Sequence, residues 1–135
     1  MQGISIKAVV LATLAVFGID FVSANLLAHA FDLPLDGTQE ELRAAVDALN
    51  QNPRYMLAAL ALGTASTVVG GYLTAYLART LPYFNALAFA ILGIAIGIPM
   101  TAGVPAGWRI IGLLITVPAA LLGAHLYKRR TGRPQ

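Results

Sequence analysis

The stretch from Gly63 to Ala78 reads GTASTVVGGYLTAYLA, and it decides the class of fold. It carries no charge and is unusually rich in small residues. Residues four apart share one face of a helix, so the small residues form one broad, flat surface. In a membrane such a surface lets neighbouring helices approach closely, and close packing holds membrane helices together. The two small-residue rows are Gly63, Thr67, Gly71 and Ala75, and Ser66, Gly70, Thr74 and Ala78.

The composition of the whole chain agrees with a membrane protein. Hydrophobic residues make up 58% of the 135 residues and charged residues 11%, against about 45–50% and 25% in soluble domains. The net charge of +3 is small and its basic residues gather near the C-terminus, which argues against nucleic-acid binding. Cysteine is absent, so disulfides and thiolate chemistry are excluded. The apolar surface that such a chain cannot bury within itself is expected to face the lipid bilayer, which is its expected partner.

Beyond this stretch, the sequence predicts a single domain over residues 1–135. The protein is expected to be an all-α integral membrane protein. We expect a four-transmembrane-helix up-down-up-down bundle with spans at about 7–31, 55–78, 83–101 and 108–127. Ala28-His29-Ala30 also has the form of a signal-peptide cleavage site, but the long stretch before it favours a retained span. Between the first two spans, residues 38–51 predict a short amphipathic helix, because Thr38 and Glu41 have the capping-box spacing.

The distribution of basic residues predicts the orientation of the bundle. With four spans, six Lys and Arg side chains lie on the side of the termini and three on the other side. This bias places both termini in the cytoplasm, with a basic cytoplasmic tail at residues 128–135 and the amphipathic helix outside. That helix is expected to lie on the bilayer surface or cap the bundle, with docking of a partner as the alternative.

Asp20 is the candidate for a chemical role, because it is the one ionisable group deep within a predicted span. Matching depths by the rise per residue brings hydroxyl groups of other spans to its level. Two interpretations stay open: a buried, protonated acid that joins helices, and a proton- or cation-coupling site. The expected polar layer consists of Asp20, Ser23, Ser66, Thr67 and Thr116.

Glycines on several spans predict close helix packing. Gly93 and Gly97 form a GxxxG pair in the third span, which we interpret as packing within the chain rather than as a dimer motif. The glycines expected to pack helices are Gly63, Gly70, Gly71, Gly93, Gly97 and Gly112.

No arrangement of residues predicts an enzyme, a cofactor or a metal site. Gly70-Gly71 lacks the Lys-Ser/Thr that completes a phosphate loop, and no Ser/His/Asp set converges. His29 lies near Asp32 and Asp36, but the spacing matches no metal-ligand pattern. We expect no catalytic residue.

In outline, four spans and one acid in the first span make the chain similar to the small multidrug-resistance exporters. Their acid is a Glu within a Trp- and Tyr-rich face, whereas the first span here carries Asp20 with phenylalanines only. The long acidic connector also departs from their short loops, so no residue role is transferred. The span with Gly70-Gly71-Tyr72 resembles those of assorted bacterial inner-membrane proteins, which implies that location.

Two functions follow as hypotheses. The favoured one is a non-enzymatic accessory subunit that packs against itself as a homo-oligomer or against a larger membrane protein, because small-residue faces are in excess. The alternative is a small proton- or cation-coupled transporter or channel that uses Asp20.

Overall fold

The computed structural model describes residues 3–132, and every regular element in that range is a helix. The five helices are α1 (Ile6–Ala30), α2 (Gln39–Leu49), α3 (Pro53–Ala78), α4 (Pro82–Met100) and α5 (Ala106–Thr131). Four of them, α1, α3, α4 and α5, are long and apolar enough to span a membrane.

The helix bounds lie within two residues of the predicted spans, except at the end of α5. That helix continues to Thr131, so residues 128–131 of the predicted tail form its last turn. Residues 133–135 of the tail lie outside the described residues.

Local sequence signals explain where the helices begin. Thr38 and Glu41 form the capping box at the start of α2, with each side chain accepting from the backbone of the other residue. The Ser5 hydroxyl accepts from the Ala8 N–H at the start of α1. Asn52 caps α3 in the same way, and Pro53 occupies its first turn, where a missing N–H costs nothing.

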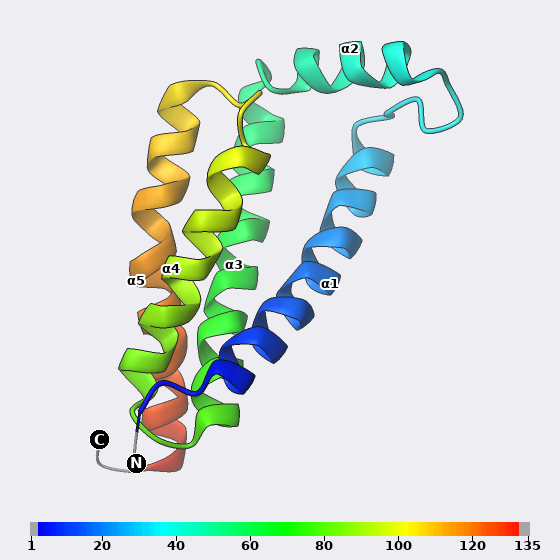
Figure 1. Ribbon diagram of the computed structural model, residues 1–135. Helices are drawn as coiled ribbons and strands as arrows, with labels where there is room; N and C mark the ends of the chain where they lie inside the picture. Colours follow the sequence, from blue (N-terminus) through cyan, green and yellow to red (C-terminus); the bar gives the residue numbers. More distant parts are fainter. Residues whose placement is uncertain (1–2, 133–135) are drawn as a thin grey trace.

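The long helices form a bundle from which α1 leans away (Figure 1). Helices α3, α4 and α5 pack side by side, while α1 lies against α3 and touches α4 mainly near its own N-terminal half. Helix α2 lies across one end of the bundle. The Asn50 side chain at the end of α2 donates to the Gly103 carbonyl between α4 and α5, at 3.2 Å. This tie fixes α2 to the loop beside it.

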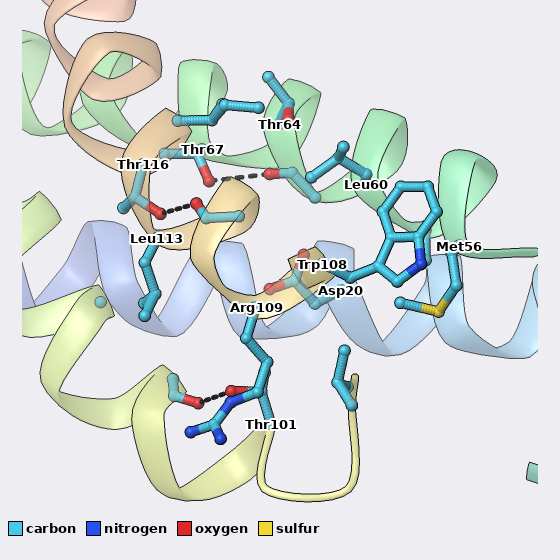
Figure 2. A pocket seen from close by; sticks show the side chains of 17 residues that line it. Asp20, Met56, Leu60, Thr64, Thr67, Thr101, Trp108, Arg109, Leu113 and Thr116 are labelled. Atoms are coloured by element: carbon cyan, nitrogen blue, oxygen red, sulfur yellow. Dashed lines mark hydrogen bonds between the residues drawn. The ribbon is translucent and has the colours of Figure 1, made fainter. Parts of the chain in front are cut away.

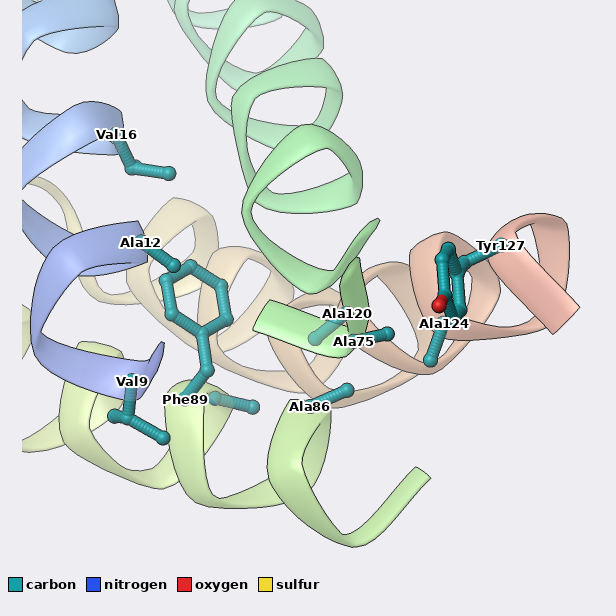
Figure 3. Packing of buried hydrophobic residues seen from close by; sticks show 10 residues of the cluster. Val9, Ala12, Val16, Ala75, Ala86, Phe89, Ala120, Ala124 and Tyr127 are labelled. Atoms are coloured by element: carbon teal, nitrogen blue, oxygen red, sulfur yellow. The ribbon is translucent and has the colours of Figure 1, made fainter. Parts of the chain in front are cut away.

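The core is built from small residues around one large ring (Figure 3). Phe89 of α4 is almost fully buried and lies among Ala12 and Val16 of α1 and alanines of α3 and α5. Gly70 leaves the space that the Phe89 ring occupies, because a Cβ there would collide with that ring. The core therefore lies in the half of the bundle opposite α2.

Helices α3 and α5 approach each other closely through glycines on both sides. A Cβ at Gly71 would collide with the backbone of Ala120, and a Cβ at Gly123 would collide with the backbone of Val68 and Tyr72. The two helices fit together because each presents a glycine to the backbone of the other. Gly123 was missing from the glycines predicted to pack helices.

A buried amide joins the start of α1 to the turn that precedes α4. Asn85 is 0% exposed. Its Oδ1 accepts from the Ser5 N–H at 2.6 Å, and its Nδ2 donates to the carbonyls of Thr80 and Leu81 at 2.9 and 3.1 Å. One side chain thus fixes the start of α1 to the turn between α3 and α4.

Candidate functional site

Asp20 lies near the middle of α1. The helix runs from Ile6 to Ala30, so Asp20 lies ~3 Å from its midpoint along the axis. The Ser66 hydroxyl of α3, 2% exposed, donates to Asp20 Oδ1 at 2.6 Å. The rest of the Asp20 side chain is exposed. The sequence placed these two residues at one depth, and the structure brings them into direct contact.

Asp20 lines a hollow region on the side of α1 that faces α4 and α5. Two adjoining cavities, of about 350 and 500 Å³, share part of their lining. We call this combined space the central cleft. The residues that line both of its cavities are Asp20, Thr67, Gly93, Gly97 and Thr116. The cleft exists because α1 leans away from α4, and because the glycines leave its walls without side chains.

Thr67 and Thr116 offer hydroxyl oxygens to the cleft as hydrogen-bond acceptors. Thr67 Oγ1 donates to the Gly63 carbonyl, and Thr116 Oγ1 donates to the Gly112 carbonyl, both at 2.8 Å (Figure 2). A hydroxyl whose one hydrogen is already donated to a carbonyl can only accept a further hydrogen bond or bind a cation. Together with the carboxylate of Asp20, the cleft therefore offers several oxygen acceptors at one level.

Ser23 of the expected polar layer is placed differently from the other members. It is half-buried on α1 and is not among the residues that line the central cleft. Ser23 follows Asp20 by three residues, about 60° around the helix, so it lies near the edge of the face of α1 that carries the acid. The structure brings together Asp20, Ser66, Thr67 and Thr116.

The six glycines expected to pack helices divide into two groups. Gly70 and Gly71 meet other helices closely, as described above. The other four have open space where a Cβ would stand, and all four line the smaller cavity of the cleft. These four are Gly63, Gly93, Gly97 and Gly112. In the described residues, these four glycines line a cavity instead of packing against another helix.

Arg109 is the site residue that sequence reasoning missed. It is one of the three basic residues counted on the side away from the termini, and it lies in the first turn of α5, where it lines the smaller cavity. Its Nη2 donates to the Ile98 carbonyl at 3.3 Å, at the end of α4 where carbonyls lack helical partners. Figure 2 shows its side chain reaching toward Thr101.

The described residues contain no group of three or more His, Asp or Glu side chains that could hold a metal ion. Comparison of the chain with protein-family models, with curated proteins and with solved structures gives no match. The geometry of the cleft is therefore what indicates the function of the chain.

Proposed function

We propose that the chain is an integral membrane protein whose four long helices cross the bilayer in alternating directions. Their length and apolar composition support this placement. Apart from Asp20, every acid lies between Asp32 and Asp47, in and before α2. Six of the nine basic residues belong to the chain segments on the side of the termini, which supports cytoplasmic termini and an extracytoplasmic α2 in a bacterial inner membrane.

Within that membrane, the function that the geometry supports best is a small proton- or cation-coupled transporter. The observation that carries the proposal is the open side of Asp20: its carboxyl faces the central cleft instead of being enclosed by protein. A bare carboxylate in contact with hydrocarbon costs several kcal/mol. Asp20 therefore needs a proton, a cation or water in the cleft, and reversible binding of a proton or cation is what a coupling group does.

The neighbours of Asp20 suit this role. Ser66 holds one carboxylate oxygen from α3, which leaves the second oxygen for a proton or a cation. Thr67 and Thr116 supply further oxygen acceptors from α3 and α5. A cation that enters the cleft exchanges part of its hydration shell for these oxygens. The glycine walls leave room for it and for a small substrate.

The test is flux through vesicles that contain the purified protein. We expect the wild-type protein to dissipate an imposed pH or Na⁺ gradient, and Asp20→Asn to reduce this flux to that of empty vesicles, because an amide neither releases a proton nor attracts a cation. Ser23→Ala is the matched control, since Ser23 lies on the same helix outside the cleft lining. Full pH-dependent flux in Asp20→Asn would refute the coupling role.

The four uncovered glycines favour a second candidate, an accessory subunit. A helix of a larger membrane protein or of a second copy can pack closely against glycine walls. In that case the partner covers Asp20 and satisfies its free oxygen. Purification in native nanodiscs followed by mass analysis separates the candidates: a stoichiometric foreign subunit or a homo-oligomer supports the packing role, and a monomeric chain purified alone removes it.

A further inference from the structure

A groove lies between the last turns of α3 and α5, at the end of the bundle opposite α2. Its volume is about 710 Å³, and it is separate from the central cleft. Two arginines, Arg79 and Arg130, line it from the two helices. Three tyrosines complete most of the wall: Tyr72, Tyr76 and Tyr127.

The groove has a fixed arrangement of rings and guanidinium groups. Arg130 Nη1 donates to the Tyr72 hydroxyl at 3.1 Å. The rings of Tyr72 and Tyr76 both meet the buried Tyr127 ring edge-on, with centroids 5.7 and 6.2 Å apart. Arg79 sits in the left-handed conformation, with a φ of 62°. A glycine would take this position without strain, so the chain keeps an arginine there at a cost in stability.

Within residues 3–132, no Asp or Glu side chain lies at this end of the bundle to neutralise these arginines. No residue after Asp47 is Asp or Glu, whereas Arg79, Lys128, Arg129 and Arg130 all belong to this end of the bundle. Asp47 lies on α2, at the far end. Among the described residues 3–132 the groove therefore has no acidic side chain as its partner, and a negatively charged ligand would supply one.

We propose that this groove binds the phosphate headgroup of an anionic phospholipid. Guanidinium groups bind phosphate oxygens through paired, charge-assisted hydrogen bonds. Tyrosine rings at a helix end suit the interface between headgroups and acyl chains, and Tyr76 is 55% exposed there. Exposed leucines next to the groove residues in sequence, Leu77 of α3 and Leu126 of α5, provide apolar surface for the acyl chains of the same lipid. The proposal depends on the membrane placement and is independent of transport through Asp20.

The experiment compares lipid binding by two arginine variants of equal charge. The purified full chain in detergent is titrated with phosphatidylglycerol and with phosphatidylcholine, and bound lipid is counted by native mass spectrometry. Arg130→Gln removes a groove residue, whereas Arg129→Gln removes a neighbouring charge that does not line the groove. We expect preference for phosphatidylglycerol in the wild type and in Arg129→Gln, and about tenfold weaker binding in Arg130→Gln.

Three outcomes would overturn the proposal: no preference between the two lipids, equal weakening by both variants, or displacement of phosphatidylglycerol by inorganic phosphate at equal concentration. The last would assign the groove to a free anion. Arg79→Gly provides a variant whose loss of binding cannot come from misfolding, because it relieves backbone strain while it removes the second guanidinium. Failure here leaves the flux test of Asp20 unaffected.

Discussion

The same substitution has opposite consequences at two glycines of this chain. Gly71→Ala places a methyl group against the backbone of Ala120, which cannot move without separating α3 from α5. Gly93→Ala places it in open space within the cleft. We expect Gly71→Ala to destabilise the bundle by about 2 kcal/mol, as overpacking does. Gly93→Ala should be neutral or slightly stabilising, because alanine favours a helix over glycine.

Unfolding in mixed micelles by titration with a denaturing detergent measures both changes. Gly112→Ala is a second control of the Gly93 kind, since its Cβ also meets open space. Equal destabilisation by all three variants would contradict the distinction between packing and cavity glycines. Equal tolerance of all three would show that α3 and α5 do not need their close approach.

At the scale of elements, Asn85 holds the start of α1 and the turn between α3 and α4 together. Asn85→Leu leaves the Ser5 N–H and the Thr80 carbonyl without their side-chain partner. A buried polar group without a hydrogen bond costs about 1–3 kcal/mol, so we expect a loss of about 2 kcal/mol. Asn25→Leu is the matched control, because Asn25 is exposed and bonds only within its own helix. Its change should stay within about 0.5 kcal/mol.

The bounds of the helices could be predicted from the sequence because their signals are local. The capping box at Thr38, Pro53 at the start of α3 and the length of the apolar stretches act within a few residues. The role of Asn85 could not be predicted in this way. It depends on Ser5, eighty positions earlier in the chain, and an isolated Asn in an apolar helix carries no sign of such a partner.

At the scale of the whole molecule, part of the candidate site could also be predicted. Depth along a helix follows from the rise per residue, and this placed Asp20 level with Ser66, Thr67 and Thr116. The cleft itself depends on the lean of α1, which is a property of how whole helices pack. Since sequence gives depth but not tilt, it could not tell which glycines meet a helix and which line a cavity.

The contents of the central cleft can be tested directly because the chain has no cysteine. A charged maleimide reacts with a thiolate in water, and a thiol in lipid or under a partner helix stays unmodified. If the cleft holds water, as the transport proposal requires, Gly97→Cys should react in intact membranes. Ala124→Cys, at a position that is 0% exposed, and Ile91→Cys, on an exposed apolar position of α4, should not react.

Reaction of Gly97→Cys should also become faster when Na⁺ is raised, and should fall less than that of a reference cysteine when the pH is lowered. A cation or proton on Asp20 removes a negative charge that disfavours a thiolate in the space that both residues line. The pH part of this test is read against a cysteine in the exposed connector, such as Gln39→Cys, since low pH reduces every thiolate. A Gly97→Cys protein that stays unmodified in membranes but reacts after purification in detergent would instead mean that another helix covers the cleft. That result would favour the accessory subunit, because the glycine walls would then be a contact surface in the native membrane.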